Sequence, residues 1–180
     1  VSVTRSIAAS ALAVLVTLAS AVPASASATD DVRAAMIKFA ALSSCRMTMD
    51  DGSTMDFVKP NSVHMSGKGM EMYTIGSTMY VKHGARGWTK IQTHGIAPAH
   101  VDDWMRTNRE RANDVSATDL GMRSVRGETL HAYRMTSKGN KPSTVYIGGD
   151  GFVRRVEGDQ PGHGVTFSNF NGIAPFRAPV

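Results

Sequence analysis

Hydrophobic residues recur at helical spacing in the first periodic segment of the chain. Val32, Met36 and Phe39 form one apolar stripe that continues to about Ser43. The preceding residues, 29–31 (Thr-Asp-Asp), offer a capping hydroxyl and two carboxylates near the positive end of a helix dipole. We therefore predict an amphipathic helix that starts at Thr29 and has an apolar face to bury.

From Cys45 the period of the pattern changes to two. Cys45, Met47 and Met49 alternate with polar residues, and Asp51-Gly52 then supplies a tight turn. Short runs of the same kind follow, with Gly-, Pro- or Asn-containing turns between them and no crossover helix. This spacing predicts an up-and-down antiparallel meander. Its expected strands after the first lie within residues 54–60, 62–67, 70–76, 78–84 and 87–92.

A second helix is predicted from Pro98 to about residue 112, with a narrow apolar stripe formed by Val101, Trp104 and Met105. Strand signals return over 121–138, 143–158 and 164–173, and Gly148-Gly149-Asp150-Gly151 reads as a hairpin turn. The order of elements is therefore helix, several strands, helix, several strands. The expected class is α+β.

The first 28 residues have the pattern of a secretory signal peptide. Arg5 precedes an apolar run from Ile7 to Val22, and small residues follow it up to Ala28. We expect cleavage after Ala28, with Ala26 as the near alternative. The expected mature protein, residues 29–180, is a single domain that is periplasmic or secreted.

Charge and cysteine content narrow the classes of partner. The chain has 20 Lys and Arg against 15 Asp and Glu, a formal net charge of +5. The basic residues are scattered, so nucleic acid is not expected as a partner. Cys45 is the single cysteine, and we interpret it as a small buried thiol with no catalytic role.

No motif for catalysis or for a cofactor is recognisable. The six histidines lack the i, i+4 spacing and the HExxH pattern of zinc sites, and GxSxG is absent. The adjacent pairs Asp50-Asp51 and Asp102-Asp103 are assigned to turn and helix-cap roles. The sequence thus predicts neither an enzyme nor a metal or cofactor site.

Methionine is the unusual feature of the predicted meander. Seven of the 11 methionines of the chain lie between residues 47 and 79. Methionine is unbranched and polarizable, so it can line a surface that adapts to flexible apolar ligands. The alternative is that these methionines pack an ordinary core.

Three stretches together carry a resemblance to a known family. They are "STMYVKHGARGWTKI", "DLGMRSVRGETLHAYRM", and "VYIGGDGFVRRVE" followed by "VTFSNFNGIAPFRAP". They resemble the lipoprotein-carrier superfamily, the LolA-like and LppX/LprG-like periplasmic proteins that bind lipids and lipoproteins. The resemblance covers about residues 30–180. It implies a strongly curved antiparallel sheet, an open half barrel, whose concave face is covered by the two helices above a cavity for acyl chains. It also implies a cargo-holding arginine, for which Arg46 is the positional candidate.

Two functions follow as hypotheses. In the first, the protein is an exported, soluble and monomeric binding protein that holds a lipid or the acyl chain of a lipoprotein, for transport to the outer membrane between membrane-bound donor and acceptor proteins. In the second, the same fold is a periplasmic sensor or adaptor that binds a polypeptide through its groove or a strand edge. The expected cavity lining is Met36, Phe39, Met47, Met49, Met70, Met72, Met79 and Trp104.

Overall fold

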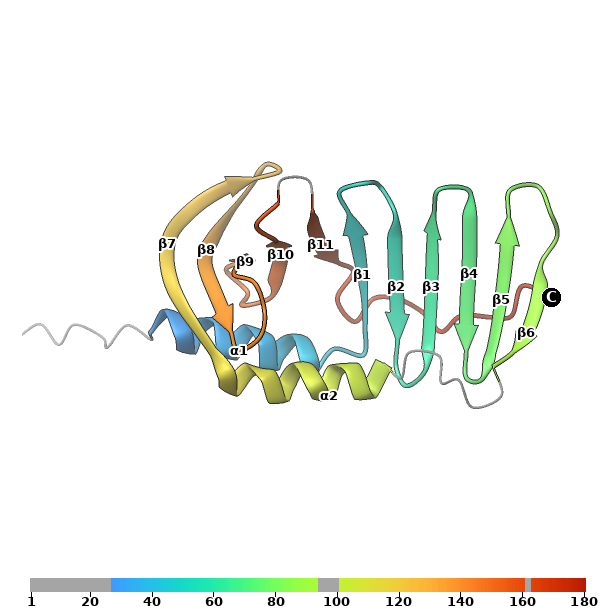
Figure 1. The fold of residues 1–180 in the computed structure, drawn as a ribbon, viewed down its shortest axis with the longest axis horizontal. Coiled ribbons are helices and arrows are strands. Elements are labelled where there is room, and N and C mark those ends of the chain that lie inside the picture. Colours follow the sequence, from blue (N-terminus) through green and yellow to red (C-terminus); the bar gives the residue numbers. More distant parts are fainter. Residues whose placement is uncertain (1–26, 94–100, 161–162) are drawn as a thin grey trace, which may run out of the picture.

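The computed structural model describes residues 27–93, 101–160 and 163–180 (Figure 1). Two α-helices, a short 3-10 helix and eleven strands make up this part of the chain. The helices are α1 (Ala28–Ala40), α2 (Val101–Arg111) and the 3-10 helix η1 (Ala112–Asp114). The strands are β1 (Ser44–Met49), β2 (Thr54–Val58), β3 (Ser62–Gly67), β4 (Met70–Ile75), β5 (Thr78–His83), β6 (Thr89–Gln92), β7 (Val115–Val125), β8 (Glu128–Ser137), β9 (Ser143–Ile147), β10 (Val153–Glu157) and β11 (Gly164–Ser168).

All eleven strands belong to one antiparallel sheet in the order β6-β5-β4-β3-β2-β1-β11-β10-β9-β8-β7. The sheet curves strongly at its β7 end and is not closed into a barrel, and the helices lie side by side along one margin of its inner face (Figure 1). This confirms the predicted α+β class and the open half barrel. The pairing of β1 with β11 joins the two meanders.

The prediction that Thr29 caps the first helix was wrong. The helix α1 begins at Ala28, two residues before a helix capped by Thr29 would begin. Ser27 is the N-cap: the Asp30 backbone N–H donates to Ser27 Oγ (3.2 Å), and Ser27 Oγ donates to Asp30 Oδ2 (2.7 Å). The Thr29 hydroxyl instead accepts a hydrogen bond from the Ala117 N–H on β7 (3.0 Å). Thr29 therefore ties α1 to the edge of the sheet. Residues 1–26 of the predicted signal peptide (1–28) lie outside the described residues, and Ser27 and Ala28 form the cap and the first residue of α1.

Most predicted strands are confirmed within one or two residues at each end, but β7 is longer than expected. It starts at Val115, and its register with β8 shifts between Asp119 and Gly121. Gly121 has φ +74°, and its N–H donates to Asp119 Oδ1 (2.6 Å). This bulge bends β7. The predicted start of the second helix, Pro98, lies outside the described residues, and α2 is described from Val101.

The strand registers place the clustered methionines on one face of the sheet. Met47 pairs with Met55, Met55 with Met65, and Met65 with Met72, so these four form a row across β1 to β4. Directly paired residues share a face, and so do residues two apart on one strand. The inner face therefore carries all seven: Met47, Met49, Met55, Met65, Met70, Met72 and Met79.

The inner face is packed by two separate clusters of buried side chains. The first joins the C-terminal end of α1 and α2 to β1–β3, and the second joins the N-terminal part of α1 to β7–β10. Phe167 on β11 packs against both clusters. The first cluster contains Phe39, Leu42, Cys45, Met47, Phe57, Val63, Val101 and Met105, and the second contains Val32, Ala35, Val115, Tyr133, Val145, Ile147 and Val153.

Candidate functional site: an apolar cavity beneath the helices

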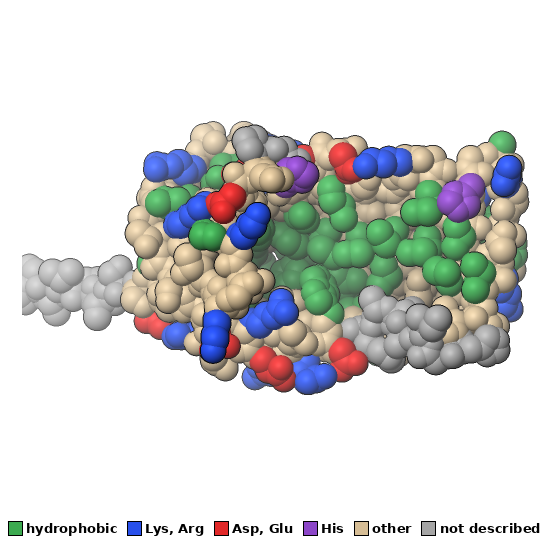
Figure 2. Space-filling view, viewed as in Figure 1, with side chains coloured by type: hydrophobic (Ala, Val, Ile, Leu, Met, Phe, Trp, Pro, Cys, Tyr) green, Lys and Arg blue, Asp and Glu red, His purple; other side chains and the backbone are tan. Residues whose placement is uncertain are grey.

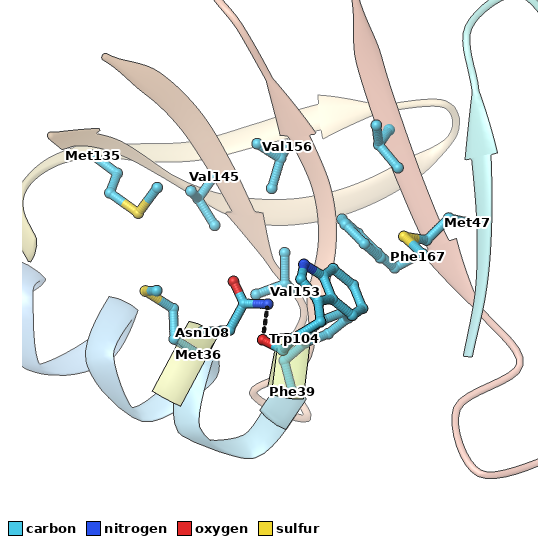
Figure 3. A pocket seen from close by; sticks show the side chains of 11 residues that line it. Met36, Phe39, Met47, Trp104, Asn108, Met135, Val145, Val153, Val156 and Phe167 are labelled. Atoms are coloured by element: carbon cyan, nitrogen blue, oxygen red, sulfur yellow. Dashed lines mark hydrogen bonds between the residues drawn. The ribbon is translucent and has the colours of Figure 1, made fainter. Parts of the chain in front are cut away.

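A cavity of about 320 Å³ lies between the two core clusters (Figure 3). Both helices and strands β1 and β8–β11 contribute to its wall. Its volume falls at the lower end of the range of about 300–1,000 Å³ that is usual for small-molecule sites. The lining residues are Met36, Phe39, Met47, Trp104, Asn108, Met135, Val145, Val153, Val156, Val165 and Phe167.

One wall of the cavity is aromatic. The Phe39 ring meets Phe167 edge to face at 5.1 Å and Trp104 at 6.0 Å, and Trp104 also meets Phe57 at 5.7 Å. Such edge-to-face pairs hold rings in defined positions. Trp104 is 38 % exposed, so the indole forms the solvent side of this wall, and it fixes α2 over the sheet.

The opposite wall is aliphatic, and a bulge in β10 shapes it. Regular alternation would put Val153 and Val156 on opposite faces, but the register of β10 against β9 shifts between Val153 and Arg155. Both valines consequently line the cavity. Arg155 points to the outer face instead, where its guanidinium bonds Asp50.

Asn108 is the single polar residue of the lining. Its Nδ2 donates to the Trp104 carbonyl oxygen at 2.9 Å, as the dashed line in Figure 3 shows. This bond satisfies part of the amide within the helix. Apart from the indole nitrogen of Trp104, the remaining side chains of the wall contain only carbon and sulfur, so the cavity favours an apolar group that needs no hydrogen-bond partners.

The eight predicted lining residues fall into three places. Met36, Phe39, Met47 and Trp104 surround the cavity. Met49 and Met70 border a second hollow of about 350 Å³ at the turn end of β1–β5. Met72 and Met79 line neither hollow; they lie on the same inner face, paired with Met65 and Val81, and with Thr74 and Ile91, respectively. Figure 2 shows hydrophobic side chains spread over this face.

Several lining residues were not predicted, because they come from the C-terminal meander. The alternation in "STVYI" and "GVTFS" places Val145, Val165 and Phe167 on the apolar faces of their strands. These residues could have been predicted by assigning the apolar faces of both meanders to the same cavity. Val153 and Val156 together could be found only by knowing the bulge.

The arginine suggested by the resemblance does not face the cavity, so Arg46 is not in a position to hold cargo there. It lies on the outer face of β1, and its Nε and Nη2 each donate to Asp56 at 2.7 Å. That carboxylate raises the pKa of the Arg46 guanidinium. On the same face His64 stacks on Tyr73 at 4.1 Å, and Phe176 of the C-terminal segment covers both rings.

The described residues offer no reactive group at the cavity. Cys45 is fully buried, as predicted, and burial raises the pKa of its thiol to about 12, which keeps it protonated. Within residues 27–93, 101–160 and 163–180, no group of three or more His, Cys, Asp and Glu side chains is placed to hold a metal ion. No helix in this part of the chain is long and apolar enough to cross a membrane.

The outer face is held by a charged cluster around Asp50. Arg155 donates to both carboxylate oxygens at 2.9 and 2.8 Å, the Gly164 N–H donates at 2.8 Å, and Arg126 donates at 2.7 Å. The Arg155 hydrogen bonds, followed by the Gly164 N–H, lower the pKa of Asp50 to about 2. The cluster ties the turn after β1 to β10, β11 and the β7–β8 turn.

The curved open sheet with two helices along its inner face is also found in a solved structure. The Mycobacterium tuberculosis lipoprotein LppX is a solved structure of this shape: the TM-score is 0.53 at 14 % identity, over 82 % of this chain and 96 % of LppX. At this identity the likeness establishes the fold alone.

Two further solved structures give lower TM-scores. Pseudomonas aeruginosa MucB in complex with MucA gives a TM-score of 0.40 at 14 % identity, over 84 % of this chain and 59 % of that one. MucB without MucA gives 0.38 at 16 % identity, over 85 % and 62 %. No protein-family model matches the chain, and no curated protein matches its sequence.

Proposed function

We propose that this protein is an exported, non-enzymatic binding protein that holds an acyl chain of a lipid or lipoprotein in the cavity beneath α1 and α2. The observation that carries the proposal is the lining: nine of the eleven side chains that form the cavity of about 320 Å³ are hydrocarbon or thioether, and the other two are Trp104 and Asn108. Water gains little in such a cavity, whereas each buried methylene contributes about 0.8 kcal/mol.

The dimensions favour one chain over several. The volume is at the low end of the range for ligand sites, so a single acyl chain fits better than a bulky multi-chain lipid. Met36, Met47 and Met135 lie around the cavity, and their flexible thioethers can adapt to chains of different length and saturation. Figure 3 shows Met36 and Met135 on one side of it and Met47 on the other.

The test measures binding of cis-parinaric acid, a fluorescent fatty acid, to the purified protein. Val156→Phe fills the cavity and is expected to weaken binding by about tenfold or more. The matched control is Thr144→Phe, because Thr144 lies on the opposite face of β9 from the lining residue Val145. It is expected to leave binding unchanged.

A series of saturated fatty acids that displace this probe tests the cause. Each methylene removed from the chain is expected to weaken binding about fourfold, which corresponds to about 0.8 kcal/mol. Equal affinities across the series, or equal binding by both phenylalanine variants, would refute the proposal. Organic extraction and mass spectrometry of the untreated protein should also release a lipid.

A second candidate function, binding of a polypeptide, is favoured by the edge strand β6. All four of its residues are exposed, and among the described residues β5 is its one strand partner. An extended peptide can pair with such an edge through backbone hydrogen bonds. The Thr93 N–H bonds the Ser77 carbonyl oxygen, so alternate residues Ile91 and Thr89 also face β5, and the Lys90 N–H faces the free edge. Lys90→Pro would remove this backbone donor, so loss of partner binding with unchanged parinaric acid binding would select this candidate.

A further inference from the structure

The two edges of the sheet, β6 and β7, lie at its opposite ends and differ in how far they are closed (Figure 1). On β7, the Ala117 N–H donates to Thr29 Oγ1 of α1 at 3.0 Å. A bulge follows between Asp119 and Gly121, and bulges hinder the pairing of an edge with a further strand. On β6, all four residues are exposed. The open edge of the sheet is therefore that of β6.

The open edge presents backbone groups that have no partner strand in the described part of the chain. The Thr93 N–H donates to the Ser77 carbonyl oxygen at 3.0 Å, so the residues that alternate with Thr93 face away from β5. These residues are Lys90 and Gln92. Each offers one N–H and one carbonyl oxygen to an incoming strand.

The two faces beside this edge differ in chemistry. Ile91 pairs with Met79 on the inner, methionine-bearing face, and it is 39 % exposed. Lys90 pairs with Tyr80, which in turn pairs with Tyr73 of the outer face. A strand added to β6 would thus place alternate side chains against an apolar face and against a lysine.

Unpaired cations gather near the outer side of the edge. Lys82 lies on the outer face of β5, and its ammonium nitrogen is 5.7 Å from the centre of the Trp88 ring. Its cross-strand partner is Glu71, but Glu71 Oε1 lies instead 3.2 Å from His64 Nε2. Three cations of the β5–β6 hairpin form no ion pair with any described residue: Lys82, Arg86 and Lys90.

From this arrangement we propose that the β6 edge binds, as an added antiparallel strand, an acidic extended segment of a partner protein. In this segment Asp or Glu alternates with apolar residues, so that the acids face Lys90 and Lys82 and the apolar residues face Ile91. Opposite charges across a strand pair are favourable, and like charges are unfavourable. An anionic lipid surface could meet the cations but has no backbone to pair with β6. The inference rests on the second candidate function, polypeptide binding, and names the chemistry of its partner.

The first test measures binding of a short fluorescein-labelled peptide, in which Glu and Val alternate, to the whole protein by fluorescence anisotropy. Two matched peptides carry Gln or Lys in place of every Glu. The Glu peptide is expected to bind tightest and the Lys peptide weakest, with about a tenfold difference or more between them. Because the cations are exposed, added salt should weaken binding of the Glu peptide more than that of the Gln peptide.

A charge exchange tests the role of Lys90. Lys90→Glu should weaken binding of the Glu peptide by about tenfold or more and should make the Lys peptide the better ligand. The matched control is Lys141→Glu, in the turn between β8 and β9. It changes the net charge equally and should keep the order of the three peptides. Circular dichroism of each variant verifies the fold.

Backbone pairing has readouts of its own. Amide hydrogen exchange of Lys90 and Gln92 should slow when the Glu peptide binds, whereas that of Thr89 and Ile91, which face β5, should not change. In an antiparallel pair the residues opposite Lys90 and Gln92 turn their N–H groups toward β6. N-methylation of every Glu should therefore abolish binding of the peptide, and N-methylation of every Val should be tolerated.

The outcomes separate the acidic partner from polypeptide binding in general. Equal affinities for the three peptides, with slowed exchange at Lys90 and Gln92, would keep the edge as a peptide site and overturn the acidic partner. Binding without slowed exchange would show attraction of charges alone and would also overturn the proposal. Tighter binding of every peptide by Lys90→Gln would show that Lys90 only protects the edge from pairing. Binding of none of the peptides would remove both the acidic partner and the edge site, while the parinaric acid assay still reports the cavity.

Discussion

Phe57 and Trp104 provide a quantitative test of how α2 is held on the sheet. Phe57 is 1 % exposed on β2, and its ring lies 5.7 Å from Trp104 and 6.3 Å from Phe39, with interplanar angles of 79° and 72°. Both pairs have the edge-to-face geometry that contributes about 0.5–1.5 kcal/mol beyond burial. Phe57→Leu keeps an apolar side chain in this position but removes both pairs.

The expected loss is therefore about 1–3 kcal/mol in the free energy of unfolding. For a domain of this size that corresponds to a fall in Tm of about 2–12 °C. Urea unfolding followed by circular dichroism measures the free energy, and the slope of the transition shows whether the unfolded state has changed.

A double-mutant cycle isolates the contact itself. Phe57→Leu and Trp104→Leu, singly and together, should give a coupling energy of about 0.5–1.5 kcal/mol. Trp88 is the control partner, because it lies against Tyr73, a residue of the outer face. Phe57→Leu and Trp88→Leu should add to within about 0.3–0.5 kcal/mol. A Phe57–Trp104 coupling no larger than this control would refute the docking of α2 described above.

Two further predictions concern the outer face and the start of α1. The pKa of Asp50 is lowered to about 2 from 3.8 in the folded protein, so the unfolded chain binds this proton more tightly than the folded protein does. The stability that the Asp50 carboxylate contributes is therefore present above pH 4 and is lost as the pH falls toward 2. Asp50→Asn should flatten the dependence of the urea midpoint on pH in that window, and an unchanged slope would contradict the cluster. Ser27→Ala should cost about 1 kcal/mol of stability through loss of the cap, provided that the exported protein retains Ser27. Intact-mass measurement of that protein distinguishes cleavage after Ala26, which keeps the cap, from cleavage after Ala28, which would leave the Ser27 substitution without effect.

The methionine face illustrates what the sequence can reveal. Alternation along each strand, together with turns rich in Gly, Pro or Asn, predicts where each strand lies and which of its residues share a face. Met47, Met49, Met70 and Met72 could therefore be assigned to one face of the sheet without coordinates. Which of them border the main cavity depends on where the helices lie. That depends on contacts between distant segments, such as Trp104 with Phe39 and Phe57.

Local irregularities account for what was missed. The bulge in β10 turns Val156 inward and Arg155 outward, and no feature of the segment "VRRVE" predicts a bulge. The cap of α1 was misplaced because Ser27 and Thr29 both carry a hydroxyl before the same acidic pair, and propensity does not choose between them. The Thr29 hydroxyl instead accepts a hydrogen bond from the backbone N–H of Ala117, a residue distant in sequence.

The junction between β1 and β11 bears on the order in which the protein acquires its native state. Every other strand pair joins segments that follow one another along the polypeptide, whereas Met47 pairs with Phe167. Short-range hairpins close quickly, and long-range closure carries a larger entropic barrier. The two meanders should therefore become structured before they meet. Since Met47 and Phe167 lie side by side in the wall of the apolar chamber, the chamber should be the last region to mature, and a nascent or truncated molecule lacking its final strand should have none.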